Sequence, residues 1–361
     1  MRCFVAAQVQ NYLNWFLRKP GKYERFMGVH LPPSIDAWGM PLETVVEDIV
    51  KFGHSDVDGE AVRTQLTGNP PLQRAVNSML GGHPYRLFSY FYNRQLQDPS
   101  IVSVLWENST TIMDSGLFSF MFGGEKDTMP ATLDAYMEYT VQYLKDLDDW
   151  NYKGILVEAD TQRLLGMPAT LELRKLFREY EDRTIFVWHE PEGFDGLEKL
   201  ALRYDYIALS IPELRMICGS GIVGGGSRKV PRMVNQLLML IHDVCRRKGK
   251  KPPKVHLLGC TVPLMMQTSL AWSCDSTLWL AGSRFAKGYI WRPGFGLKMA
   301  WIRSEAFAKY KSHAIEQYPG AHEFAMQQIN PGYYLDLLTS AHALGQYQRW
   351  LDTRYSPVEM R

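Results

Sequence analysis

Gly154-Ile-Leu-Val-Glu158 and Thr184-Ile-Phe-Val-Trp188 are nearly continuous runs of apolar residues. Parallel strands have this composition when helices bury both faces of their sheet. Six further apolar runs give eight strand candidates, the number that a (β/α)8 barrel needs. The candidates are Cys3–Ala7, Arg86–Tyr92, Thr111–Asp114, Gly154–Asp160, Thr184–His189, Tyr206–Ser210, Val255–Cys260 and Trp272–Leu278.

Segments with helical periodicity separate several of these runs. Ala131–Leu147, Pro168–Tyr180 and Pro231–Arg247 repeat apolar residues three or four positions apart, and each begins at or beside a proline. Strands that alternate with helices predict a parallel α/β fold. We therefore predict a single α/β domain over residues 1–361, a TIM-like (β/α)8 barrel.

Two regions depart from this alternation. Residues 12–82 separate the first two strand candidates by far more than an ordinary connection. We predict that they form an inserted, mostly helical subdomain on the active-site side. For residues 319–361 we predict a C-terminal helical segment, with a helix at Tyr333–Leu351 packed on the barrel exterior.

The composition narrows the class of protein. With 361 residues, 46% of them apolar, and a formal net charge of +2, the chain can bury a large core and is not a disordered polyelectrolyte. The small net charge does not exclude nucleic-acid binding, because cations can cluster. The five scattered cysteines predict reduced core residues, and the lack of a long apolar run or leader predicts a cytoplasmic protein without membrane contact.

Polar residues gather at the carboxyl ends of the strand candidates. They are Asp114, Glu158, Asp160, His189, Glu190, Ser210 and Asp275. Barrel strands bring these ends to one face, so we expect the side chains to share one mouth. Asp114 and Asp275 form a pair of carboxylates suited to attack at the anomeric carbon of a sugar. Helix capping or a turn is the alternative role for any one of them.

Phe118 and the loop cations are further candidates. Gly116 permits a tight turn that brings Phe118 to the mouth, where it can stack on a base, although a core position is the commoner role of Phe. Arg228 and Lys229 precede a helix and can hold a phosphate, unless the loop binds nothing. Arg284 and Lys287 follow Asp275 and are expected to meet phosphates near the chemistry. We expect the basic run Arg246–Lys254 on the opposite face.

Two further motifs are weaker evidence for a binding site than the acids at the strand ends. Gly219-Ser-Gly-Ile-Val-Gly224 matches a dinucleotide-binding fingerprint, but the residues before it predict a helix rather than a strand. His242 with Cys245 and His256 with Cys260 could pair as zinc ligands on paper, but the chain has no Cys-x2-Cys pair. We predict no metal site and no cofactor.

The order of the motifs carries a family resemblance. Val255-His-Leu-Leu-Gly259 followed by Cys274-Asp275 resembles the tRNA-guanine transglycosylase superfamily, in which a Leu-Met-Gly-like strand end precedes the nucleophilic aspartate. Asp114-Ser-Gly-Leu-Phe118 resembles the family's Asp-Ser-Gly-Gly-Phe motif. The resemblance covers roughly residues 86–290.

The resemblance implies a role for each candidate. It makes Asp275 the nucleophile, Asp114 the general acid and base, and Phe118 the stacking ring. It implies that Asp160 recognises guanine and that Ser210 and Gly259 shape the base pocket. His189 and Glu190 stand where the family has a glutamine.

One departure from the family changes the expected substrate. The tRNA enzymes carry a Cys-x-Cys-x2-Cys and His zinc site after the nucleophile, whereas no cysteine follows Cys274 here. The chain therefore looks more like the shorter, phage-type branch, which replaces guanine in DNA by a 7-deazaguanine such as preQ0. The resemblance implies DNA as partner, with tRNA as the alternative acceptor, and free 7-deazaguanine and guanine as small ligands.

Three other functions stay open at this point. A barrel hydrolase could cut an N- or O-glycosidic bond with the same two acids. A non-catalytic nucleic-acid-binding relative is a second possibility, which the presence of both Asp114 and Asp275 disfavours. A nicotinamide enzyme using the Gly219–Gly224 loop is a third.

Overall fold

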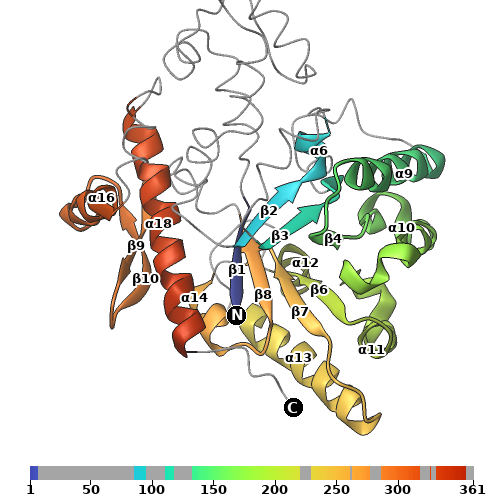
Figure 1. Cartoon of the computed structure of the whole chain (residues 1–361). Coiled ribbons are helices and arrows are strands. Elements are labelled where there is room, and N and C mark those ends of the chain that lie inside the picture. The colour runs from blue at the N-terminus through green and yellow to red at the C-terminus, as the bar shows by residue number, and fades with distance from the viewer. Residues whose placement is uncertain are drawn as a thin grey trace, which may run out of the picture.

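The computed structural model describes residues 1–6, 85–94, 110–117, 132–219, 229–260, 262–276, 286–317, 326 and 331–354. Parallel strands β1 to β8 close into a barrel in sequence order, and β8 pairs with β1 (Figure 1). The strands are β1 (Arg2–Ala6), β2 (Tyr85–Ser89), β3 (Thr110–Asp114), β4 (Ile155–Val157), β5 (Thr184–Trp188), β6 (Tyr206–Ser210), β7 (Lys254–Leu258) and β8 (Ser273–Ser276). The predicted α/β fold with a parallel barrel is confirmed.

Helices lie between successive strands over most of the described chain. They are α6 (Tyr90–Asn93), α9 (Leu133–Asp149), α10 (Gln162–Arg174), η2 (Lys175–Arg183), η3 (Glu190–Glu192), α11 (Gly193–Arg203), α12 (Ile211–Ile217), α13 (Lys229–Arg247) and α14 (Pro263–Thr268). The helices predicted at Ala131–Leu147 and Pro231–Arg247 are present as α9 and α13. The prediction at Pro168–Tyr180 is wrong in its bounds, because α10 bends at Gly166 (φ +78°) and the chain tightens into the 3-10 helix η2.

The barrel strands are buried on both faces, which explains their apolar sequences. Leu87, Ile112 and Val187 belong to one hydrophobic cluster, whereas their strand neighbours Phe88 and Met113 belong to a second, larger cluster that includes residues of the surrounding helices. Alternate residues of a strand point to opposite faces, so each strand needs apolar residues at successive positions.

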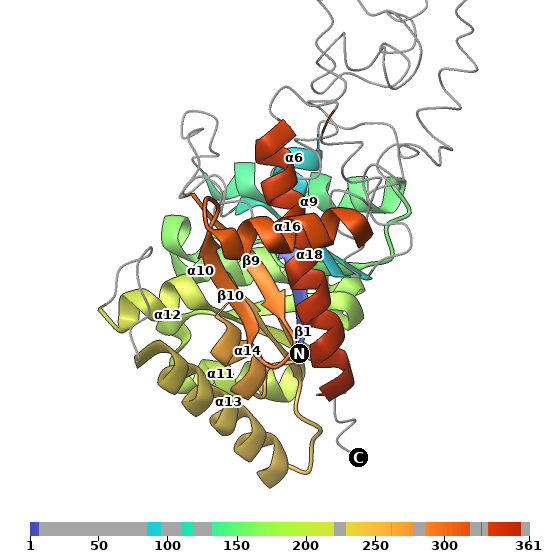
Figure 2. The ribbon, with the colours of Figure 1, turned by 90° about the vertical axis from the view of Figure 1, so that its left-hand side faces the viewer.

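A C-terminal unit packs against the barrel. It consists of the antiparallel hairpin β9 (Lys287–Arg292) and β10 (Gly296–Trp301), then α16 (Glu305–Gln317) and α18 (Pro331–Arg354). Helix α18 contacts both β1 and β9, and it lies between the barrel and the hairpin (Figures 1 and 2). The helix predicted at Tyr333–Leu351 is thus part of α18. The insertion predicted at 12–82 lies outside the described residues.

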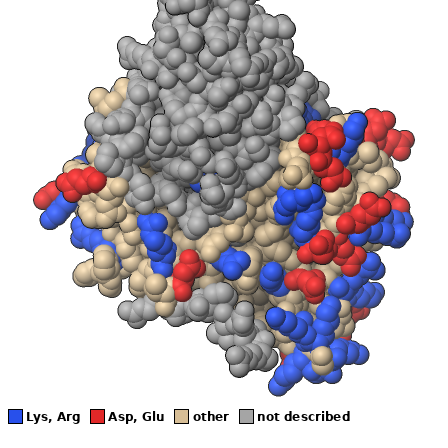
Figure 3. All heavy atoms as spheres, viewed as in Figure 1, with Lys and Arg blue, Asp and Glu red and all other residues tan. Residues whose placement is uncertain are grey.

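The basic run Arg246–Lys254 gathers at the C-terminal end of α13, where Figure 3 shows a cluster of Lys and Arg side chains. Helix α13 leads into the start of β7, so this cluster lies toward the amino ends of the strands, as predicted. None of the helices in the described part of the chain combines the length and apolar composition needed to cross a bilayer.

Candidate active site

The turn after β3 positions Asp114 at the carboxyl-end face of the barrel. Backbone N–H groups of Ser115 and Gly116 donate to its carboxylate, and Tyr139 Oη of α9 donates to the carbonyl of Ser115 at 2.7 Å. Gly116 has φ = +81°, and a Cβ atom there would lie 2.4 Å from Cβ of Phe91. Only glycine fits this position of the turn, which explains the glycine of the Asp-Ser-Gly sequence.

The environment of Asp114 changes its acidity. Burial raises the pKa of its carboxyl to about 7, and the negative charges of Asp275 and Asp160 add to the rise. The N–H groups of Gly116 and Ser115 offset part of it. A carboxyl with a pKa near neutrality can donate and accept a proton at physiological pH, which is the requirement for general acid and base catalysis.

Asp275 in β8 is only 8% exposed, and one of its oxygens is fixed. Oδ1 accepts a hydrogen bond from the backbone N–H of Gly259 at 3.0 Å and lies 3.1 Å from His256 Nε2. Gly259 adopts φ = +69°, a conformation that favours glycine. Within the described residues no hydrogen bond engages Oδ2, so this oxygen is the one left to act on a ligand.

A buried chain of hydrogen bonds continues from His256 across neighbouring strands. His256 Nδ1 lies 2.6 Å from Ser273 Oγ, which lies 2.6 Å from Tyr206 Oη. Burial raises the pKa of Tyr206 well above its ordinary value, so the phenol keeps its proton. With the phenol as donor, Tyr206 can donate to Ser273 and Ser273 can donate to Nδ1, an arrangement in which Nε2–H donates to Asp275. In this hydrogen-bond relay the histidine tautomer presents a donor to Asp275.

His189, directly after β5, is buried beside two carboxylates. Its Nδ1 lies 3.4 Å from Glu213 Oε2 and its Nε2 lies 3.4 Å from Asp160 Oδ1. Burial alone would lower the pKa of His189, but the hydrogen bond to Glu213 and the charges of Asp160 and Glu158 outweigh it and raise the pKa. Buried Nε2 has no hydrogen-bond partner in the described chain, which marks a place for a polar ligand.

Glu158 has a structural role, because its carboxylate is fully engaged by neighbouring groups. Its carboxylate forms a two-pronged ion pair with Arg174, with N–O distances of 2.7 and 2.9 Å. Val187 N donates to the same carboxylate at 2.6 Å. Arg174 also reaches Glu192 at 3.2 Å, and Glu192 accepts from the backbone N–H of His189 at 3.0 Å. The buried ion pair thus fixes the strand end that carries His189.

The remaining predicted base-binding residues differ in what the structure shows of them. Ser210 Oγ accepts from the backbone N–H of Glu213 at 3.4 Å, so it caps α12, the alternative role considered for it. The Glu190 side chain is exposed, and its backbone N–H donates to Glu213 at 3.0 Å. Three predicted residues lie outside the described part of the chain: Phe118, Arg228 and Arg284.

The two described candidates for phosphate contact lie on different elements. Lys229 is exposed at the start of α13. Lys287 begins β9, and its Nζ lies 4.8 Å from the ring centre of Trp301 on β10. Lys287 therefore belongs to the C-terminal hairpin.

The sequence did not single out Tyr206 or Glu213 as parts of this site, and it offered His256 only as a possible zinc ligand with Cys260. Tyr206 and His256 lie in apolar runs that are typical of core residues, and Glu213 lies in the first turn of a short helix. The only signal in the sequence was the rarity of a histidine in the middle of a buried strand, at His256.

The described chain contains no group of three or more His, Cys, Asp and Glu side chains placed to hold a metal ion. The segment before the Gly219–Gly224 motif is helix α12, so the motif does not follow a strand as a dinucleotide site requires. The chain matches no protein-family model, and no curated protein matches it.

Proposed function

We propose that this chain is a base-exchange transglycosylase that replaces guanine in DNA with a 7-deazaguanine such as preQ0. Asp275 attacks C1′ of the deoxyguanosine sugar, the bond from C1′ to guanine breaks, and Asp114 protonates the departing base. The entering base then transfers a proton to Asp114 and attacks C1′, and the ester to Asp275 breaks. The protein begins and ends each cycle in the same protonation state.

The observation that carries the proposal is the contrast between the two carboxylates. Asp275 has one oxygen held by two donors and the other available. Asp114 has a pKa raised to about 7 beside it. Two neighbouring acids in such different environments suit a nucleophile and a proton carrier, the division of roles in retaining glycosyl transfer.

The base would be recognised by the groups after β4 and β5. Asp160 would accept hydrogen bonds from N1–H and the 2-amino group of guanine, a pattern that both guanine and preQ0 present. His189 Nε2 would supply a further polar contact beside Asp160, and Phe118 would stack on the ring. A nucleotide in duplex DNA would have to flip out, at a cost of a few kcal/mol.

The barrel supports the same assignment. We assign it to the (β/α)8 class, whose enzymes carry their chemistry at the carboxyl ends of the strands. A DNA acceptor would place the protein in the cytoplasm, in the host cell if a phage encodes it.

An exchange assay tests the proposal. Labelled preQ0 is incubated with the full chain and, separately, with DNA and tRNA acceptors. We expect label in DNA with the wild-type chain and none with Asp275→Asn. Label in tRNA alone would contradict the choice of acceptor. Release of guanine without incorporation would favour a barrel N-glycoside hydrolase that uses the same acids.

A further inference from the structure

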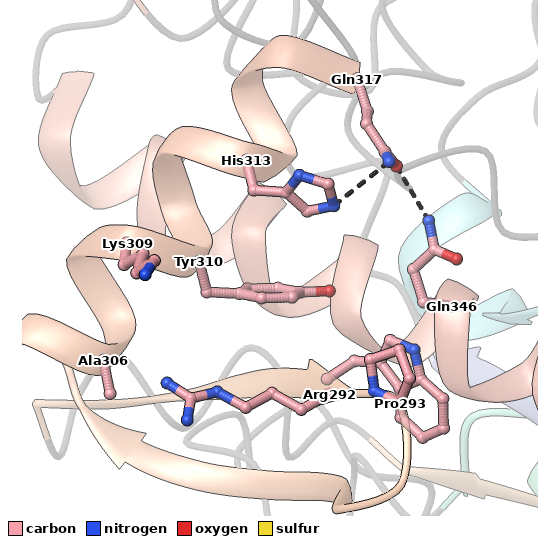
Figure 4. Close-up of a pocket in the computed structure, with 9 residues that line it drawn as sticks. Arg292, Pro293, Ala306, Lys309, Tyr310, His313, Gln317 and Gln346 are labelled. Atoms are coloured by element: carbon pink, nitrogen blue, oxygen red, sulfur yellow. Dashed lines mark hydrogen bonds between the residues drawn. The ribbon is translucent and has the colours of Figure 1, made fainter.

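A pocket of about 440 Å³ opens on the C-terminal unit, away from the barrel strands. It lies between the end of β9, one face of α16 and residue Gln346 of α18 (Figure 4). This volume is in the range of sites for small organic ligands. Its lining residues are Trp291, Arg292, Pro293, Ala306, Lys309, Tyr310, His313, Gln317 and Gln346.

The two ends of the pocket differ chemically. Arg292 and Lys309 lie at the end near Ala306, while Gln317 and Gln346 lie at the other (Figure 4). Both cations are exposed, and neither forms an ion pair within the described chain. The pocket therefore offers positive charge at one end and amide groups at the other, with aromatic walls from Trp291 and Tyr310.

The amide end is organised before any ligand arrives. Gln317 Oε1 accepts from Gln346 Nε2 at 2.9 Å and lies 2.9 Å from His342 Nε2. Gln317 Nε2 lies 3.2 Å from His313 Nε2, and Tyr310 Oη lies 3.0 Å from His342 Nδ1. Gln346 Oε1 makes no hydrogen bond within the described residues, so it is an available acceptor. Fixed amides beside an aromatic wall suit the edge of a nucleobase.

The hairpin next to the pocket extends its positive charge. Residues 286–304 contain four Lys or Arg and no Asp or Glu. Phe295 and Trp301 on the hairpin are 69% and 59% exposed. Lys298 lies 5.3 Å from the ring centre of Phe295. Exposed aromatic rings interleaved with cations are typical of surfaces that bind single-stranded nucleic acid.

We propose that this pocket binds one nucleotide of a nucleic-acid strand, with its phosphate at Arg292 and Lys309 and its base against Trp291, Tyr310 and the amide end. The choice of a strand over a free mononucleotide rests on the proposed function and on the adjoining hairpin. The occupant is a nucleotide other than the one that reacts, because the pocket is lined by the C-terminal unit and not by barrel strand ends.

Binding of a fluorescent oligothymidylate, which contains no guanine, tests this pocket. The full chain is titrated at several salt concentrations and compared with the double variant Arg292→Gln, Lys309→Gln. We expect affinity to fall by about tenfold or more, and the slope of log K against log salt to shrink by roughly 0.7, as expected when one phosphate of a single strand loses its cations. The matched control, Arg247→Gln with Lys248→Gln, removes two exposed cations from the end of α13 and should bind as wild type.

Equal losses in both double variants, or no loss in the first, would overturn the proposal. Binding of free thymidine monophosphate as tight as that of the oligonucleotide would overturn the assignment to a strand. The exchange assay and this titration can fail independently, because the probe carries no base that the proposed reaction could release.

Discussion

Asp114 and Asp275 are electrostatically coupled: after burial, the charge of Asp275 is the largest contribution that raises the pKa of Asp114 to about 7. The coupling joins the end of β3 to β8, which lie on different sides of the closed barrel. Because of this coupling, the carboxyl of Asp114 can exchange a proton near neutral pH. The carboxylate of Asp275 is held by Gly259 and His256. Each consequence of this arrangement can be measured.

The raised pKa of Asp114 has a cost in stability. Because the folded protein binds this proton more tightly than the unfolded chain, the free energy of unfolding falls as pH rises from about 4 to about 7. The full difference corresponds to roughly 4 kcal/mol at most. Asp114→Asn should therefore unfold at a higher temperature than wild type at pH 8, and lose this advantage at pH 4. The exposed Asp149→Asn variant is the control, and an equal gain for Asp114→Asn at both pH values would contradict the account.

The same carboxyl should control the first half of the reaction. In the proposed reaction guanine departs only when Asp114 is protonated, so the single-turnover rate of guanine release should be constant below pH 6 and fall above about pH 7. The rate should fall about tenfold per pH unit, as for loss of one proton. Quenched-flow sampling of released guanine checks it. A rate that rises through this range would show that guanine release requires deprotonated Asp114, which contradicts the prediction.

The relay behind Asp275 should affect turnover without affecting DNA binding. Tyr206→Phe removes the donor to Ser273, and loss of one buried hydrogen bond, about 1 kcal/mol, predicts a roughly fivefold lower kcat with an unchanged KM for DNA. Tyr152→Phe is the matched control, since it removes a buried hydroxyl bonded to Thr111 at 2.9 Å, outside the relay. Steady-state kinetics measure kcat and KM for both variants. Equal losses of kcat would show that the relay contributes only to packing.

The turn after Asp114 should accept no side chain. Gly116→Ala combines a positive φ with a Cβ placed 2.4 Å from Cβ of Phe91. Gly249→Ala isolates the backbone cost, because φ is +64° there and nothing lies within 4 Å of the added atom. We expect a loss of about 1–2 kcal/mol for Gly249→Ala and at least about 1 kcal/mol more for Gly116→Ala, measured by denaturant unfolding. Similar losses would show that the turn can relax.

The barrel could be predicted from sequence because its strands are buried on both faces. Neighbours such as Ile112 and Met113 must both be apolar, so each strand stands out as a run. The hairpin β9–β10 cannot be predicted in this way, because only Leu297 of β10 is buried and that strand lacks such a run. The turn Arg292-Pro-Gly-Phe-Gly296 was its signal. The sequence places Lys287 only by its nearness to Asp275 along the chain, and the structure adds that it begins β9.

The acids of the site could be predicted because parallel strands end at one face. The relay could not, because it depends on register. Ala208 pairs with His256, and His256 pairs with Ser273, which brings β6, β7 and β8 side chains together inside the barrel. A sequence shows that His256 is surrounded by apolar residues, and the predicted barrel gives its flanking strands. It does not give the register, so it does not show which side chains of those strands His256 contacts.

The role of Asp275 as nucleophile is tested most directly by the mass of the protein after reaction with guanine-containing DNA in the absence of an entering base. We expect a species with the mass of the chain plus the DNA strand minus guanine for the wild type, and no such species for Asp275→Asn. An adduct of the same mass formed by Asp275→Asn would contradict the assignment of Asp275 as the nucleophile.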